Sequence, residues 1–188
     1  MNLNLPDRNK SENLLKHYIT SSSLREHCYM VAQAMQAYAR MNGKGESEQE
    51  LWWTSGLLHD LDWEMYPDEH PIRAADEILP AAGYPETVID AVRSHAPERS
   101  GKEPVSEMEC YLFACDELSG FMKAVALMRP NEFGDMKARS VIKKMKDKRF
   151  AANVSRSDIH KGTELIKKEL NEHISFLISV FNKSESSD

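Results

Sequence analysis

The sequence predicts an all-α protein, a compact bundle of several helices. Apolar residues recur at the three- and four-residue spacing of an amphipathic helix along most of the chain. The alternating runs of β-branched and polar residues that indicate strands and hairpins are missing. With 188 residues, of which 41% are hydrophobic, the chain has enough apolar material for one domain.

The first third of the chain is expected to contain a short helix and two longer ones. The short helix covers 14–19, and the serines at 21–23 supply an N-cap for a second helix that ends at the glycines of 42–45. A third helix begins near Ser47, which forms a capping box with the glutamate three residues later. This helix should end at the His59-Asp60 pair.

Proline and glycine separate the helices expected further along the chain. A loop at 66–68 contains Pro67, which disfavours helix just before it. Pro71 and Pro104 are well placed to open helices. The expected helices span about 71–78, 86–96, 105–128, 135–148 and 158–181.

This pattern predicts a single helical domain over residues 11–182. Its core covers about 22–128, and its C-terminal helices cover 135–182. Residues 1–10 are expected to form a flexible N-terminus. The polar residues 183–188 are expected to form a disordered tail.

Composition excludes several classes of protein. A net charge of −6 and a pI near 5.7 argue against an extended nucleic-acid surface, which needs clustered Lys and Arg. Three cysteines without a CxxC pair argue against a disulfide framework. No apolar run approaches the ~20 residues that span a bilayer, and the N-terminus lacks an apolar signal region. We therefore expect a cytoplasmic protein that does not contact a membrane.

Six residues are candidate metal ligands, and five of them fall at helix ends or beside loops. They are His27, His59, Asp60, His70, His95 and Asp116. Imidazole and carboxylate are ligands that Fe, Mn, Zn and other divalent ions accept, whereas unpaired cysteines exclude a structural thiolate zinc site. Adjacent helical residues point about 100° apart, so the 59–60 pair can reach one ion only near a helix end.

The order and local sequence of these residues resemble the HD superfamily of metal-dependent phosphohydrolases. An upstream His is followed 32 residues later (59 minus 27) by the HD pair in GLLHDLDWE, and a distant Asp lies in YLFACDELSG. Between them, one His begins a helix and another lies in AVRSHAP. The resemblance spans about 22–125. It is closest to symmetrical dinucleoside-tetraphosphate hydrolases and to small stand-alone bacterial HD proteins.

The resemblance implies one or two divalent ions, with Fe and Mn first and Mg, Co, Ni and Zn as alternatives. Members with two further histidines hold two ions, a pattern that His70 and His95 match. One ion would then lie near His27, His59 and Asp116, and the other near His70 and His95. Asp60 would bridge them.

The activity implied is hydrolysis of a phosphomonoester or phosphoanhydride, of a nucleotide or a similar small phosphorylated substrate, by metal-activated water. The expected catalytic residues are Asp60 with Asp116 or Glu64 as proton acceptor. Asp62 and Glu64 also fit local caps or solvated charges, and either could instead orient water. Substrate phosphate would be bound by a set of cations, for which an ordinary surface position is an equal alternative. They are Arg73, Arg99 and Lys102.

Other residues have less specific interpretations. The histidines that match no motif, His17, His160 and His173, are expected at the surface. The tryptophans are expected to anchor the core, and Trp63 has a base-binding pocket as its alternative. They are Trp52, Trp53 and Trp63. The basic run 143–149 fits a solvated helix face, with a phosphate clamp or a partner contact as the alternative.

A second function from another class stays open at this point. The domain could be a metal- or nucleotide-binding sensor or interaction domain with little or no turnover. The oligomeric state is also open, with a homodimer as one alternative.

Overall fold

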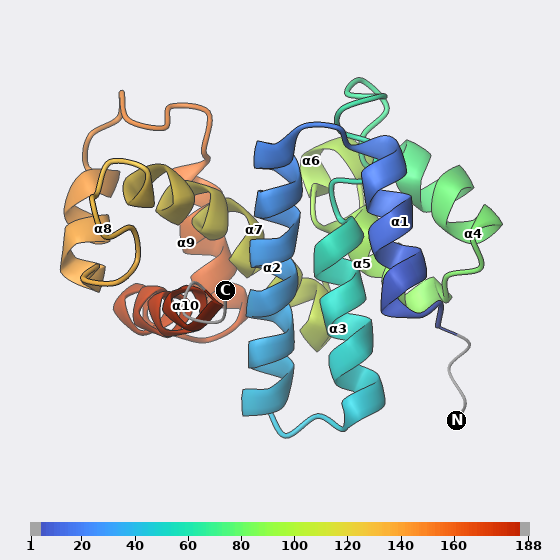
Figure 1. Cartoon of the computed structure of the whole chain (residues 1–188), viewed down its shortest axis with the longest axis horizontal. Coiled ribbons are helices and arrows are strands. Elements are labelled where there is room, and N and C mark those ends of the chain that lie inside the picture. Colours follow the sequence, from blue (N-terminus) through green and yellow to red (C-terminus); the bar gives the residue numbers. More distant parts are fainter. Residues whose placement is uncertain (1–4, 185–188) are drawn as a thin grey trace. The chain divides into compact units, whose positions relative to one another are not determined.

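The computed structural model describes residues 5–184, in which every regular element is a helix, so the predicted all-α fold is confirmed (Figure 1). The elements in chain order are α1 (Arg8–Tyr18), α2 (Ser22–Met41), α3 (Glu46–Leu58), the π-helix η1 (Ala74–Ile78), α4 (Leu79–Ala81), α5 (Glu86–Ser94), α6 (Pro97–Ser100), α7 (Glu107–Ala126), α8 (Ala138–Met145), α9 (Arg156–Leu165) and α10 (Leu170–Ser184). None of these helices combines the length and apolar character needed to cross a membrane.

The chain forms two compact units, Met1–Phe113 and Ala114–Asp188. The first carries α1 to α6 with the start of α7, and the second carries the rest of α7 with α8 to α10. The expected single domain over 11–182 stays a prediction. Helix α1 begins within the segment expected to be a flexible terminus, because the Asp7 carboxylate accepts a hydrogen bond from the Lys10 amide at 2.9 Å and caps the helix. The remaining residues of the terminal segments, 1–4 and 185–188, lie outside the described residues.

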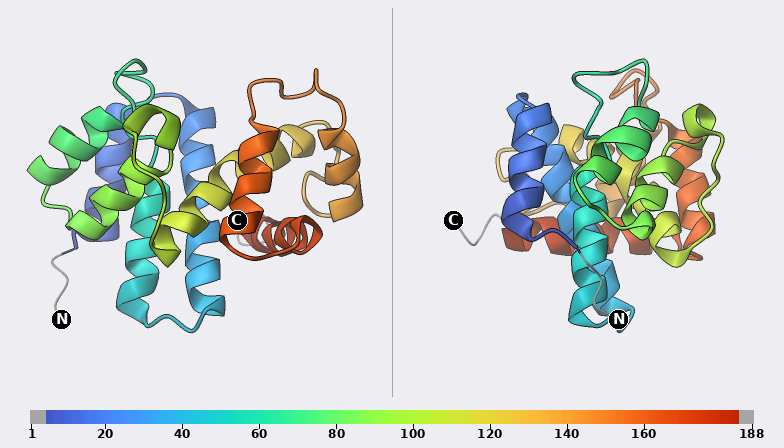
Figure 2. Two further views of the ribbon diagram at one scale, coloured as in Figure 1. Left: turned by 180° about the vertical axis from the view of Figure 1, so that it is seen from behind. Right: turned by 90° about the vertical axis from the view of Figure 1, so that its right-hand side faces the viewer.

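Helices α2 and α3 run side by side and form the centre of the first unit (Figures 1 and 2). The hydroxyl of Ser21 caps α2 by accepting from the Leu24 amide, as predicted. The capping box predicted for α3 is wrong, since Gly45 is the N-cap and provides no side-chain bond. The two helices approach closely at Gly56, where an added Cβ would lie 2.8 Å from the backbone of Ala32.

The apolar core of the first unit draws on α1, α2, α3, the η1 segment and α5. Representative members are Leu15, Ala32, Leu57, Leu79 and Val92, each of which has no exposed surface. The prediction that tryptophans anchor the core is confirmed for two of them. Trp52 is 3% exposed and Trp53 is 4% exposed, but Trp63 is 42% exposed and does not belong to the core.

The second unit corrects two predictions. The helix expected over 158–181 is two helices, α9 and α10, because Lys167 adopts a left-handed conformation with φ of 53° and turns the chain. His173, predicted at the surface, is fully buried, and its Nε2 donates to the carbonyl of Ala114 at 3.0 Å. Burial lowers the pKa of His173 to about 4, because the protonated ring would lose its hydration.

The buried His173 should make the stability of the protein depend on pH. Its pKa is about 4 in the folded chain but ~6.5 in an unfolded one, so the unfolded state binds one more proton between these values. The stability that the buried neutral ring of His173 contributes is therefore fully present above pH 6.5 and is lost as the pH falls toward 4. Between pH 7 and 5, urea unfolding of the wild type should lose about 2 kcal/mol more than that of His173→Gln. The exposed His160→Gln serves as control, and parallel curves for the wild type and His173→Gln would contradict the assignment.

Gly56→Ala should destabilise the protein, although the same change in an open helix position usually stabilises it by about 0.5–1 kcal/mol. The new Cβ would meet backbone atoms of α2 at 2.8 Å, and backbone cannot move aside as a flexible side chain can. We expect a loss of about 1–3 kcal/mol in the free energy of unfolding. Gly45→Ala is the control, because no heavy atom lies within 4 Å of its added Cβ, and its replacement as the N-cap of α3 should cost less than about 1 kcal/mol. Equal melting temperatures of the two variants would refute close packing at Gly56.

Candidate metal centre

His27 and His59 meet because α2 and α3 pack closely. His27 lies in the second turn of α2, and His59 is the residue that ends α3. Their Nε2 atoms are 3.2 Å apart. The carbonyl of Gly56, the residue at the close approach, accepts a hydrogen bond from the Nδ1 of His59 at 2.8 Å. One turn of α3 therefore sets both the helix spacing and the direction of this imidazole.

Asp60 places its two carboxylate oxygens against two different pairs of histidines. Its Oδ2 lies 3.3 Å from the Nε2 of His59 and 3.8 Å from that of His27. Its Oδ1 lies 3.6 Å from the Nε2 of His70 and 3.7 Å from that of His95. Each triplet of two imidazoles and Asp60 is compact enough to hold a metal ion.

His70 and His95 reach the site from separate segments. His70 follows the turn after α3, and His95 is the residue that ends α5. The Nδ1 of His95 donates to the carbonyl of Val92 at 2.6 Å. The side chains of His70 and His95 are 3% and 2% exposed, whereas those of His27 and Asp60 are 14% and 15% exposed. The cluster is therefore open to solvent on the side of His27 and Asp60.

These side chains fit a metal ion because lone pairs of imidazole nitrogens and carboxylate oxygens converge without protons between them. His59, His70 and His95 each direct Nδ1 at an oxygen that can only accept, so Nδ1 carries the proton. In the neutral ring, Nε2 then carries no proton and can offer its lone pair to a metal ion. Three such nitrogens facing one carboxylate repel each other unless a cation or added protons lie between them. Neutral imidazoles with anchored Nδ1 and a carboxylate are the ligands of divalent ions in proteins.

The electrostatics of Asp60 agree with this arrangement. Burial alone would raise the pKa of Asp60 by penalising its charge. The neighbouring imidazoles, His59 first and then His95 and His27, outweigh burial and hold that pKa well below its ordinary value. Asp60 is therefore a carboxylate at neutral pH.

Asp62 is the residue of this site that sequence reasoning missed, since we interpreted it as a cap or a solvated charge. It is fully buried, and its Oδ1 accepts from the Nδ1 of His70 at 2.7 Å. Its Oδ2 accepts from the amide of Ala74 at 2.7 Å, at the start of η1. Asp62 thus orients His70 and ties it to the next helix. Its place two residues after Asp60 was the available signal, but spacing cannot show burial.

Asp116 and Glu64 are the two further residues predicted to act in catalysis. Asp116 lies on α7 in the second unit, and its membership of the ligand set stays a prediction. The carboxylate of Glu64 accepts from the hydroxyl and amide of Thr20 and from the amide of Ser21. The hydroxyl of Thr20 contributes most to lowering the pKa of Glu64. These contacts favour the interpretation of Glu64 as a cap of α2, and its role as proton acceptor stays a prediction.

Of the cations predicted to bind phosphate, Arg99 forms a hydrogen bond to the backbone of a clustered histidine, His70. Its Nη1 donates to the carbonyls of Pro67 at 2.6 Å and of His70 at 3.3 Å, which fixes the loop that carries His70. Its guanidinium also lies 5.1 Å from the centre of the Trp63 ring. The Trp63 ring in turn meets His70 edge-on at 4.8 Å, so this exposed tryptophan shields one side of the imidazole.

The other two predicted cations pair with carboxylates. Arg73 donates a hydrogen bond to Glu77 at 2.9 Å. It lines a separate pocket of about 370 Å³ that does not include the residues of the cluster, which are His27, His59, Asp60, His70 and His95. Lys102 forms an ion pair with Asp90 and lies 3.7 Å from Glu109. Their contacts favour ordinary surface roles, and phosphate binding by either stays a prediction.

Comparison with known proteins gives one match, to a family model. The family model of the HD domain matches residues 24–120, more than half of the chain, and this range contains all six residues predicted as ligands. No curated protein and no solved structure matches the chain.

Asp62→Asn should weaken divalent metal binding about 10–100-fold, the usual effect of losing a partner that orients a ligand. The amide keeps the size of the carboxylate but has only one acceptor oxygen, so it cannot serve both His70 and Ala74. The measurement is a Mn²⁺ titration by calorimetry. Asp68→Asn, at an exposed turn position, is the matched control. Equal affinities of the two variants would show that Asp62 does not orient His70.

Proposed function

Since this chain belongs to the HD domain family, we propose that it is a metal-dependent phosphohydrolase that cleaves a phosphomonoester or phosphoanhydride of a nucleotide. The observation that carries the proposal is the convergence of four imidazole Nε2 atoms on the two oxygens of Asp60. A purely structural site is normally closed by its ligands, whereas this cluster is open on one side. The proposal extends the family membership to an activity and a substrate class.

The two oxygens of Asp60 support a dinuclear centre with Asp60 as the bridge. His27 and His59 would bind one ion through Nε2. The resemblance to the HD superfamily adds Asp116 to the ligands of that ion. His70 and His95 would bind the other. When bound, divalent ions activate water for attack at neutral pH and neutralise charge on the phosphoryl group. Fe and Mn are the ions that we would test first.

The protein's own residues would position the substrate and handle protons. Asp60 remains ionised at neutral pH because its imidazole neighbours keep its pKa low. Asp116 or Glu64 would take the proton released from water. Arg99 would bind a phosphate that is not transferred, and it is better placed for this than the other two cations because its hydrogen bonds go to backbone carbonyls rather than carboxylates. Arg73 and Lys102 would have to exchange a carboxylate for phosphate.

Asp60→Asn should abolish hydrolysis and reduce the bound metal, because the amide carries no negative charge and offers one oxygen where the carboxylate offers two. The assay is a panel of nucleotide monophosphates and dinucleoside polyphosphates with Mn²⁺ or Fe²⁺, on protein purified without oxygen and analysed for metal. Asp68→Asn should retain full activity, since Asp68 is exposed and lies in a turn.

Each outcome of this experiment decides between functions. An Asp60→Asn protein with normal activity would disprove the metal centre. Wild-type protein that binds metal but turns over nothing on the panel would favour the alternative, a metal- or nucleotide-binding sensor domain. Absence of any metal uptake by the wild type would leave only an interaction module.

A further inference from the structure

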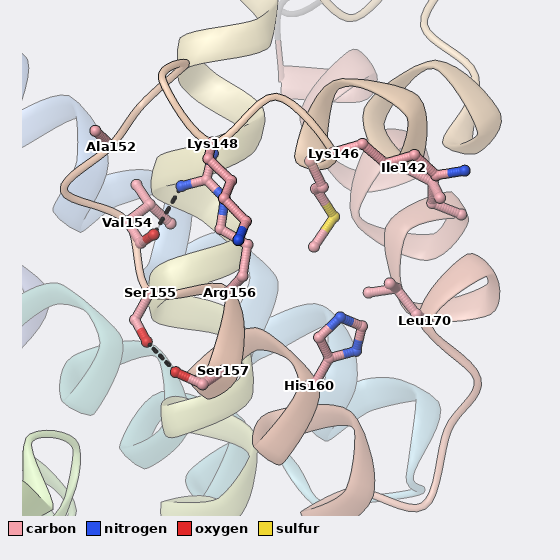
Figure 3. A pocket seen from close by; sticks show the side chains of 11 residues that line it. Ile142, Lys146, Lys148, Ala152, Val154, Ser155, Arg156, Ser157, His160 and Leu170 are labelled. Atoms are coloured by element: carbon pink, nitrogen blue, oxygen red, sulfur yellow. Dashed lines mark hydrogen bonds between the residues drawn. The ribbon is translucent and has the colours of Figure 1, made fainter.

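The second unit contains a pocket of about 620 Å³ that has no part in the metal centre (Figure 3). It is formed by residues of the segments 142–148 and 152–160 together with Leu170, and we call it the α8–α9 pocket. Pockets of about 300–1,000 Å³ are the usual size for small organic ligands. The α8–α9 pocket is therefore large enough for a small molecule.

One wall of the α8–α9 pocket is a loop that Arg156 holds in place. The guanidinium of Arg156 donates to the carbonyls of Phe150, Ala151 and Val154, and it lies 4.7 Å from the centre of the Phe121 ring. The rings of Phe121 and Phe150 also meet edge-on at 5.5 Å. Because these contacts order the loop in advance, a ligand would pay little conformational entropy to bind there.

The lining of the α8–α9 pocket has two kinds of side chain. The apolar residues are Ile142, Met145, Val154 and Leu170. The basic residues are Lys146, Lys148, Arg156 and His160. In Figure 3, Lys148 and Arg156 lie on one side of the pocket, and Lys146, Ile142 and Leu170 lie on the other. None of the described residues that line the pocket is Asp or Glu, although the chain as a whole has a net charge of −6.

Some cations of the basic run 143–149 lie close to a carboxylate, whereas others form no ion pair within the described part of the chain. Lys144 and Arg149 lie 3.6 Å and 3.9 Å from carboxylate oxygens of Asp147. Among the residues that the structure describes, no carboxylate forms an ion pair with Lys146 or Lys148, and both are exposed at the pocket. The two unpaired ammonium groups give the mouth of an apolar cavity a positive charge.

We propose that the α8–α9 pocket binds a small amphipathic anion. Its terminal carboxylate or phosphate group would pair with Lys148, and its apolar body would extend across the pocket to Ile142 and Leu170. Lys146, on the side of Ile142, would add to the positive charge around the pocket. A neutral apolar molecule would gain nothing from the charges of Lys146 and Lys148, and a simple inorganic anion would leave the apolar side of the pocket uncovered. The proposal does not depend on the activity of the metal centre.

Titration calorimetry on the full chain with octanoate and with octylphosphonate tests the proposal, since neither can be hydrolysed as a phosphate ester. Both should bind the wild type, with an affinity that falls as salt is added, whereas octanol should bind more weakly. Methyl resonances of ¹³C-labelled methionine should shift at Met145, which lines the pocket. Absence of binding, a Met145 signal that does not move, or equal affinity for octanol would each overturn the proposal.

Two double variants with the same loss of charge locate the ligand. Lys146→Gln with Lys148→Gln should weaken binding of both anions about tenfold or more, because the charged contact of Lys148 and the attraction by Lys146 are both lost. Lys143→Gln with Arg149→Gln removes two cations of the same run that do not line the pocket, and it should leave the affinity unchanged. Circular dichroism checks that both remain helical. Equal weakening in the two double variants would indicate general charge attraction and overturn the assigned site.

Discussion

The first unit depends on one electrostatic constraint, which is that unprotonated imidazole nitrogens must face the carboxylate of Asp60. Such an arrangement is unfavourable without a cation, so the surrounding structure has to impose it. On the side of each ring away from Asp60, a separate oxygen accepts a hydrogen bond from the Nδ1 of His59, His70 or His95. The same hydrogen bonds that orient the rings leave their Nε2 atoms available to a metal ion.

The scaffold meets this constraint at the ends of helices. His59 and His95 each end a helix and bond a carbonyl three residues earlier, so the turn that terminates the helix also aims the ring. His70 lies between helices and has no such carbonyl, and the buried carboxylate of Asp62 provides the acceptor instead. Close packing at Gly56 then brings α2 near enough for His27 to join them.

Charge is distributed unevenly along this acidic chain. The metal centre gathers an anionic carboxylate and imidazole nitrogens, which suits the binding of cations. The α8–α9 pocket gathers basic residues beside apolar side chains, which suits the binding of an anion. A net charge of −6 therefore describes neither site, because net charge says little about local surroundings.

The sequence by itself determined the helical class, the cap at Ser21 and the residue types and order of the HD family, because periodicity, capping and short motifs are local properties. Only the tertiary structure decided which oxygen of Asp60 faces which histidine, that Asp62 is buried, that His173 is buried while Trp63 is exposed, and that Lys167 divides the last helix. These features depend on contacts between residues distant in the chain. Spacing along a helix shows which face a side chain occupies but not what lies against that face.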